Sequence, residues 1–404
     1  MAWEVKKLGD VCTLFADGDW IEKKDQSSNG IRLIQTGNVG IGVFKDRGEK
    51  ARYISEKTFE RLRCTEIIEG DCLISRLPDP VGRACILPNA GEKMITAVDC
   101  TIIRFYQKTF LTKWFVYYSL SNEYQTQIDQ QVSGATRQRI SRNNLGFIKI
   151  PVPPIAEQKT IVAILDKAFE SIILVKENAE KNLNNSKEVF ESYLQSVFEN
   201  KGEGWEEKTL GETCIVERGS SPRPIKKYVT TKADGVNWIK IGDTKEVEKY
   251  IYTTEQKITP EGALNSRLVN VGDFILSNSM SFGKPYIMKT QGYIHDGWFV
   301  LRLPKNIDTE FFWYLLASKY TMNQFIHLAS GAIVKNISGD LVKKTILPIP
   351  PLREQQLIVK KLDTLSQETK KLELIYEKKL TNLEELKKSI LQKAFNGELI
   401  EASA

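Results

Sequence analysis

Cationic and amide side chains gather in four stretches that are rich in turn-forming residues. Arginine can hold a phosphate, or the O6 and N7 edge of guanine, through two parallel hydrogen bonds, and asparagine does the same for adenine. Each residue alone could equally be a solvated surface charge, but together they predict contacts to a nucleic acid. The predicted contact residues are Arg76 and Arg83 in SRLPDPVGRA, Arg137, Arg139 and Arg142 in SGATRQRISRNN, Arg218, Arg223, Lys226 and Lys227 in RGSSPRPIKKY, and Lys335 and Asn336 in SGAIVKNISGD.

Catalytic motifs have little support. No Walker A motif occurs, and the glycines of GNVGIG, residues 37–42, are in the wrong order for a dinucleotide loop. The carboxylates and lysines near residues 17–24 resemble fragments of a metal-dependent nuclease site, but the second half of the chain has no counterpart. The first half contains no histidine to activate a nucleophile. We therefore predict a binding protein with no catalytic residues.

Cysteine usage argues against a metal site or a cofactor. The six cysteines contain no C-x-x-C pair, and the chain has only two histidines, His295 and His327. Buried free thiols are the simpler interpretation. We predict no metal and no cofactor.

Composition predicts a globular, cytoplasmic protein of two or three domains. The 404 residues are 41% hydrophobic and 27% charged, and the N-terminus lacks the apolar run of a signal peptide. No apolar stretch could span a bilayer, so we expect no membrane partner. The net charge is +6; residues 1–150 carry 22 Lys and Arg against 18 Asp and Glu, and residues 201–347 carry 20 against 16. This modest basic excess suits a polyanionic partner.

The whole chain is a tandem repeat. WEVKKLGDVC at residues 3–12 recurs as WEEKTLGETC at residues 205–214, and EGDCLIS recurs as VGDFILS. Residues 133–166 align without a gap to residues 330–363, with 14 of 34 positions identical. Because the order of the matching segments is preserved, we infer a duplication.

Each half divides into a globule and a long helix. We predict globules at residues 1–152 and 201–349, and helices at residues 153–200 and 350–404. The globules combine short β-rich runs and turns with a helix at residues 111–128, matched at residues 308–326, which is typical of an α/β or α+β domain. A Pro-Pro pair, in IPVPPIAEQ and LPIPPLREQ, ends a strand and opens each long helix.

Heptad spacing predicts that the two long helices pair with each other. Two apolar sets run seven residues apart along each helix, and a strip of this length needs a partner. The predicted helix-contact residues are Leu165, Ile172, Tyr193, Leu362, Leu372, Tyr376, Leu383 and Ile390. Two equivalent units related by a pseudo-two-fold axis would pair their helices antiparallel. The alternative is that each helix only covers its own globule.

The repeated features resemble the specificity (S) subunits of type I DNA restriction-modification systems. The resemblance covers essentially the full chain and rests on the duplicated PVPPIAEQ and PIPPLREQ, on the W-E-x-K-x-L-G start of each half, on RGSSPRP in the second half, on SGAT and SGAI, and on the helices that end in LQSVF and LQKAF. The first globule lacks the G-S/T-x-P turn found at residues 219–222.

The resemblance implies two target recognition domains, each reading one half of an asymmetric, interrupted double-stranded DNA site. The long helices would be a spacer that sets the gap and a docking surface for two methyltransferase (M) subunits, with restriction (R) subunits joining the full complex. Methylation and cleavage would belong to these partners. The alternatives are a DNA enzyme, whose motifs are absent, and a coiled-coil scaffold that binds proteins only. Affinity for DNA that falls steeply with salt would separate the scaffold from a DNA reader.

Overall fold

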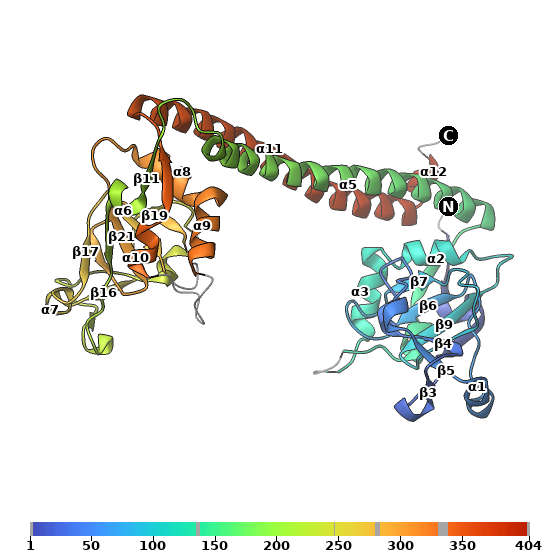
Figure 1. Ribbon diagram of the computed structural model, residues 1–404. Coiled ribbons are helices and arrows are strands. Elements are labelled where there is room, and N and C mark those ends of the chain that lie inside the picture. Colours follow the sequence, from blue (N-terminus) through green and yellow to red (C-terminus); the bar gives the residue numbers. More distant parts are fainter. Residues whose placement is uncertain (1–2, 135–137, 246, 279–282, 330–337, 402–404) are drawn as a thin grey trace. The chain divides into compact units, whose positions relative to one another are not determined.

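Two compact units make up the chain. The computed structural model describes residues 3–134, 138–245, 247–278, 283–329 and 338–401 (Figure 1). The first unit comprises Met1–Glu180 and Lys378–Ala404, and the second comprises Lys181–Glu377. Each unit therefore holds one globular domain and a part of both long helices.

Three small sheets form the globular domain of the first unit. A two-stranded sheet pairs β1 (Glu4–Lys7) with β10 (Lys149–Val152). The second sheet has the order β2 (Cys12–Asp17), β9 (Cys100–Phe105), β6 (Cys72–Ser75), β7 (Ala84–Ile86), and the third has the order β3 (Gln26–Ser27), β5 (Arg52–Ile54), β4 (Ile31–Ile34), β8 (Met94–Thr96). Its helices are α1 (Glu56–Leu62), α2 (Thr112–Tyr118), α3 (Asn122–Gln131) and α4 (Arg142–Gly146).

The second unit repeats this topology and adds one strand to each larger sheet. β11 (Glu206–Thr209) pairs with β22 (Ile346–Ile349). The larger sheets have the orders β12 (Ile215–Arg218), β21 (Trp298–Arg302), β18 (Phe274–Ser277), β19 (Pro285–Met288), β15 (Tyr250–Ile251), and β13 (Val229–Thr230), β16 (Gln256–Ile258), β14 (Val236–Ile239), β20 (Gly292–Ile294), β17 (Arg267–Val269). The helices are α6 (Leu210–Thr213), α7 (Pro260–Ala263), α8 (Thr309–Ala317), α9 (Lys319–Ala329) and α10 (Gly339–Lys343). The matching strand orders confirm the duplication and the mixed α+β class.

The central strands β6 and β18 are buried at every position because both faces of their sheets are covered. All four residues of β6 are buried. Cys72 and Ile74 face a core shared with the helices, whereas Leu73 faces a core shared with the neighbouring sheet. Phe274 and Ile275 of β18 divide in the same way in the second unit. The alternation of side chains along a strand thus serves two cores at once.

The helix predicted over residues 111–128 is two helices, α2 and α3. Ser121 caps α3, because its hydroxyl accepts a hydrogen bond from the Tyr124 backbone N–H. Such a cap requires an extended residue and so separates the helices. The matching region of the second unit is also divided, into α8 and α9, at Ser318.

Each Pro-Pro pair joins a strand to a long helix, as predicted. α5 (Ile155–Glu199) follows β10, and α11 (Leu352–Phe395) follows β22; a short helix, α12 (Glu398–Glu401), ends the chain. In the first turn of α5, the Glu157 carboxylate accepts a hydrogen bond from the Trp3 indole at 2.9 Å. Glu354 accepts one from Trp205 at 2.8 Å in α11. The duplicated Trp and Glu residues therefore tie the start of each domain to its helix.

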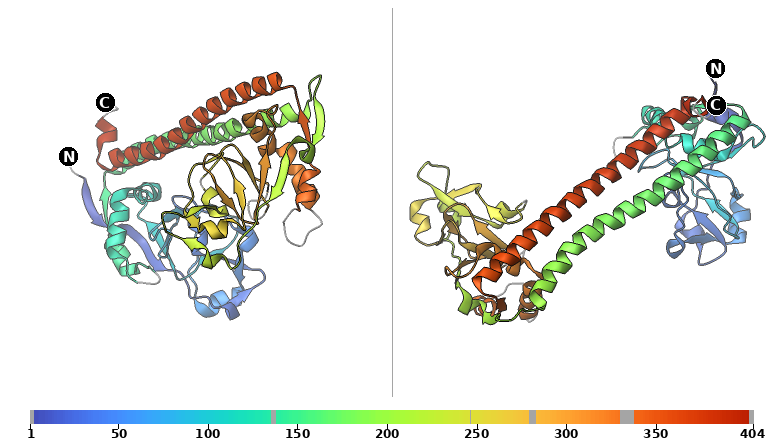
Figure 2. Two further views of the ribbon diagram at one scale, coloured as in Figure 1. Left: turned by 90° about the vertical axis from the view of Figure 1, so that its left-hand side faces the viewer. Right: turned by 90° about the horizontal axis from the view of Figure 1, so that it is seen from above.

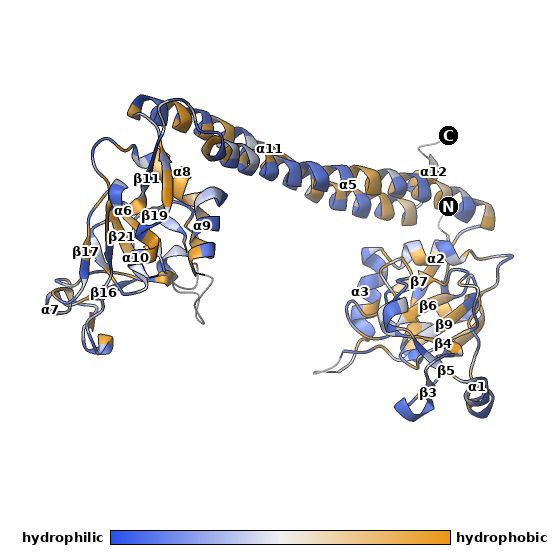
Figure 3. Cartoon of the chain, in the orientation of Figure 1, coloured by the Kyte–Doolittle hydropathy of each residue, from blue (hydrophilic) through white to orange (hydrophobic). Residues whose placement is uncertain are grey.

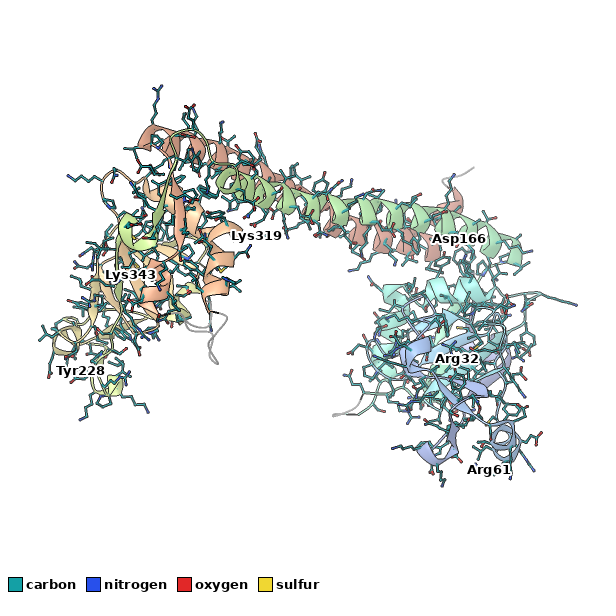
Figure 4. The ribbon with its side chains drawn as sticks, in the orientation of Figure 1. Arg32, Arg61, Asp166, Tyr228, Lys319 and Lys343 are labelled. Atoms are coloured by element: carbon teal, nitrogen blue, oxygen red, sulfur yellow. The ribbon has the colours of Figure 1, made fainter. Side chains whose placement is uncertain are left out.

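The glutamine that follows each of these glutamates is buried and bonds three backbone groups. Gln158 accepts a hydrogen bond from the Leu111 N–H at 2.9 Å and donates to the carbonyls of Thr109 and Pro153 at 3.0 and 2.8 Å. Gln355 makes the equivalent three bonds in the second unit. About two turns further on, Asp166, labelled in Figure 4, accepts a hydrogen bond from Tyr117, and Asp363 accepts one from Tyr314. The repeated motif thus fixes a recognition domain onto a helix.

The long helices run antiparallel (Figure 2), and hydrophilic and hydrophobic segments alternate along both (Figure 3). One heptad set forms their seam, because its members Leu165, Ala179, Ser186, Leu362, Thr369 and Leu383 are buried. In the first unit, Leu165 of α5 shares a core with Leu391 and Phe395 of α11. In the second unit, Leu194 and Phe198 of α5 share a core with Leu362 of α11. The end of α11 therefore completes the core of the first domain, and the end of α5 completes the core of the second. The two helices thus both pair with each other and cover the globular domains, which were offered above as alternatives.

Candidate nucleic-acid interface

Three arginines and two carboxylates converge at one edge of the first domain. Arg76 Nη2 lies 3.2 Å from Asp17 Oδ1, and Arg142 Nε lies 3.9 Å from Asp17 Oδ2. Arg139 Nη2 lies 3.3 Å from Asp99 Oδ1. Three predicted contact residues that are distant in sequence are thus brought together around Asp17 and Asp99, which were not among the predicted contact residues.

Strand register explains this meeting. Asp17, the last residue of β2, pairs with Thr101 of β9, and Ser75, the last residue of β6, pairs with Cys100. Asp17, Arg76 and the turn that contains Asp99 therefore share one edge of the sheet. Arg139 joins them from a bridge between Ser133 and Arg139, and Arg142 from the first turn of α4. Arg137 lies outside the described residues.

Arg76 and Arg83 are held by their own domain. Arg76 is 3% exposed and also donates to the Val98 carbonyl. Burial lowers the pKa of its guanidinium, and the Asp17 carboxylate opposes this shift. Arg83 donates to four carbonyls, those of Val39, Leu77, Pro80 and Thr36. Both arginines support the turns of the predicted interface, and any contact they make to a nucleic acid stays a prediction.

Asp296 is the centre of a similar cluster in the second domain. Its carboxylate accepts a hydrogen bond from the Ser221 hydroxyl at 2.8 Å and lies 3.4 Å from Arg223 Nη2. Its backbone carbonyl accepts from Arg218 Nε at 3.3 Å and from Asn278 Nδ2 at 3.0 Å. Burial alone would raise the pKa of Asp296, but the hydrogen bond from Ser221 and the Arg223 charge help to hold it below its ordinary value.

The two clusters occupy equivalent places. Asn278 follows β18 as Arg76 follows β6. Each side chain donates to a carbonyl in the turn before the neighbouring strand of the sheet, β21 or β9. Gly18 N donates to Cys100 O, and Gly219 N donates to Trp298 O, both at 2.8 Å. The first domain therefore keeps the glycine of the turn, although the rest of G-S/T-x-P is absent.

The structure describes some of the remaining predicted contact residues of the second domain. Arg223 has an 82% exposed side chain, and Lys226 and Lys227 are exposed on the 3-10 helix Ile225–Lys227. Lys335 and Asn336 lie outside the described residues. The described cations of RGSSPRPIKKY thus form an accessible basic turn next to Asp296.

The heptad residues separate into an internal set and an exposed set. Leu165, Leu362 and Leu383 are buried, and Ile172, Tyr193, Tyr376 and Ile390 are half-buried, so these side chains contact the chain itself. Leu372 instead is 43% exposed. In the same heptad set, seven residues apart along each helix, Val175 is 36%, Val189 52% and Leu386 47% exposed, whereas Leu365 and Val197 are half-buried. An apolar strip thus remains uncovered on the helices.

The described ranges hold neither a metal-binding cluster nor a membrane-spanning helix. Within them, no group of three or more His, Cys, Asp and Glu side chains is arranged to hold a metal ion. No helix among the described residues is long and apolar enough to cross a membrane.

Comparisons with known proteins place this architecture in a family. The model of the type I restriction modification DNA specificity domain matches residues 2–185 and again residues 202–382. The type I restriction enzyme MjaVIII specificity subunit of Methanocaldococcus jannaschii is 26% identical over 339 residues, which cover 77% of each chain. The chain therefore belongs to the family of type I restriction-modification DNA specificity proteins, and it carries two specificity domains in tandem.

Solved structures show the same fold. One, from work on the complex assembly and conformational transition of the type I R-M system, has a TM-score of 0.79 at 19% identity over 98% of both chains. The HsdS subunit of Thermoanaerobacter tengcongensis has a TM-score of 0.65 at 19% identity over 98% of this chain and 97% of that one.

Proposed function

We propose that this chain reads an asymmetric, bipartite DNA site, with one recognition domain for each half. The observation that carries the proposal is the pair of non-identical arginine–aspartate clusters at the same edge of two duplicated domains. Arg139 and Arg142 serve the first domain, and Arg218 and Arg223 serve the second. The fold repeats because both recognition domains need the same attachment to a long helix. The clusters differ because the two half-sites differ in sequence.

The carboxylates in these clusters orient the arginines before DNA arrives. An arginine held by a carboxylate loses less conformational freedom on binding than a free one. It also gains less binding free energy from a phosphate of unrelated DNA, because the carboxylate already balances part of its charge. We therefore assign Asp99 and Asp296 to target selection, beside the cations that contact the DNA.

The exposed heptad strip provides the docking surface for methyltransferase subunits. Val175 and Val189 of α5 lie at the repeat positions of Leu372 and Leu386 of α11, 197 residues apart. In the second unit, Val189, Tyr193, Leu357 and Leu365 line an open groove. A duplicated apolar surface of this kind suits two equivalent partners. Restriction subunits would join the same assembly, and the chain itself would supply no catalysis.

Methylation sequencing tests this function. DNA modified by the methyltransferase partner with this chain should carry methyl groups in one two-part motif, and DNA modified without the chain should not. Random methylation by a demonstrably assembled complex would show that the domains do not read DNA. The protein scaffold would then be the better account.

Helix length should set the gap between the half-sites. Inserting one heptad into both helices, after Glu180 and after Glu377, keeps the seam in phase and lengthens the pair by roughly 10 Å. We expect the gap to grow by about three base pairs, since DNA rises about 3.4 Å per pair. The matched control replaces seven residues of each helix with the same sequence and adds none. Altered half-site bases at an unchanged gap would contradict the spacer role.

A further inference from the structure

The segment that follows Gly18 in the first domain is the structural counterpart of the basic RGSSPRPIKKY turn. It leads from β2 through the 3-10 helix Lys23–Asp25 to β3, as the second turn leads from β12 through Ile225–Lys227 to β13. A Cβ on Gly18 would lie 2.3 Å from the Ala97 carbonyl oxygen, and one on Gly219 would lie 2.0 Å from that of His295. Each segment is therefore packed against the equivalent sheet edge of its own domain.

Trp20 is the large apolar side chain that this segment presents to solvent. It is 70% exposed, whereas its neighbour Ile21 packs into the domain core. A single exposed apolar residue needs no explanation by itself. Trp20, however, lies three residues after Asp17, which contacts Arg76 and Arg142 of the proposed interface.

The backbone beside Trp20 is firmly held. Asp19 N donates to the Thr96 carbonyl at 2.7 Å, and the Asp19 carbonyl accepts from Val98 N at 2.9 Å. The Asp19 carboxylate accepts from Thr65 N at 3.0 Å. An exposed indole on a fixed backbone is pre-organised for contact.

Polar neighbours orient the indole and leave its faces uncovered. Trp20 Nε1 donates to Glu22 Oε1 at 3.4 Å, and the other Glu22 oxygen lies 2.7 Å from Lys24 Nζ. The 3-10 helix that begins after Glu22 is tied in turn to α1 by the Asp25–Arg61 ion pair (Figure 4). The result is a flat apolar surface beside a lysine, on the segment that corresponds to the basic turn carrying Arg223 in the second domain.

We propose that Trp20 contacts DNA and helps the first domain to select its half-site. This inference rests on the proposed function and deepens it. The indole lies against base pairs of the half-site read by this domain and contributes contact without charge, while Lys24 contributes a phosphate contact. Aromatic and apolar side chains act in this way where proteins grip bases and deform the duplex. The first domain thus combines arginines from its C-terminal loop with an aromatic contact from its N-terminal turn.

The test uses the full chain assembled with its methyltransferase partner and DNA that carries the methylated motif. Trp20→Ala should weaken binding to this DNA by roughly tenfold, about 1.4 kcal/mol, because the contact of the indole with the half-site is lost. The slope of log affinity against log salt should not change. Lys24→Ala should lower that slope by about one. Tyr106→Ala is the matched control, because Tyr106 is 50% exposed just beyond the opposite end of β9.

A second variant tests whether Trp20 contacts the bases or only lies near the phosphates. Trp20→Lys should raise affinity for unrelated DNA and reduce discrimination at the half-site of the first domain. If the wild-type complex selects its target but Trp20→Ala and Trp20→Lys keep the same affinity and the same motif, the role of Trp20 is wrong. The proposed function would then still stand. A wild-type complex that fails to distinguish target from unrelated DNA would overturn the proposed function and this inference together.

Discussion

Gly219→Ala should abolish discrimination at the half-site of the second domain while the other half-site is still read. The added Cβ would lie 2.0 Å from the His295 carbonyl oxygen and 2.8 Å from its carbon, so backbone must move on one side. We expect a destabilisation of about 2–3 kcal/mol, typical of overpacking, and a melting temperature lower by roughly 5–10 °C in the second unit. The shift displaces the turn that holds Ser221 and Arg223 against Asp296.

Gly242→Ala is the matched control. A Cβ at Gly242 meets nothing within 4 Å, and this glycine lies in the same unit. Methylation sequencing and thermal unfolding of both variants make the comparison. If Gly219→Ala kept the full motif and melted like Gly242→Ala, the turn at Gly219 would not be part of the reading surface.

The second large effect is expected at the buried glutamines. Gln355→Leu removes three hydrogen bonds and leaves the Asp308 N–H and the Pro350 carbonyl without this partner in a buried setting. An unsatisfied buried group costs about 1–3 kcal/mol, so we expect the second unit to lose roughly 3 kcal/mol. Amide hydrogen exchange should accelerate where β22 meets α11. Gln158→Leu should act in the same way on the first unit.

Gln356→Leu provides the control for this effect. Gln356 is the next residue along α11 and is exposed, so the same substitution there removes no buried hydrogen bond. Its melting temperature should stay close to that of the wild type. Equal losses in Gln355→Leu and Gln356→Leu would refute the anchoring role of the motif.

Features read from repeated local patterns were predictable from the sequence. The duplication, the strand-to-helix junctions at the Pro-Pro pairs and the pairing of the long helices follow from spacing and residue type alone. The division of residues 111–128 into α2 and α3 was missed, although Ser121 is a recognisable cap. The apolar periodicity of residues 111–128 suggested one continuous helix and gave no sign of the break at Ser121.

Features that depend on strand register could not be read from sequence. Asp17 and Asp99 meet the arginines only because β2 and β6 end, and β9 begins, at one edge. Arg83 looks like a surface turn residue, yet its guanidinium meets four carbonyls whose positions no local pattern reveals. The aligned Gly18 and Gly219 were the available signal for Trp20, but the segment after Gly18 lacks the rest of the G-S/T-x-P motif.

Exchanging residues 1–152 for those of a family member with a different target tests the central claim most directly. Methylation sequencing of the hybrid, assembled with the same methyltransferase partner, should show one new half-site, one unchanged half-site and an unchanged gap. A motif that stayed wholly the same, or that changed in both halves, would contradict the assignment of one domain to each half-site.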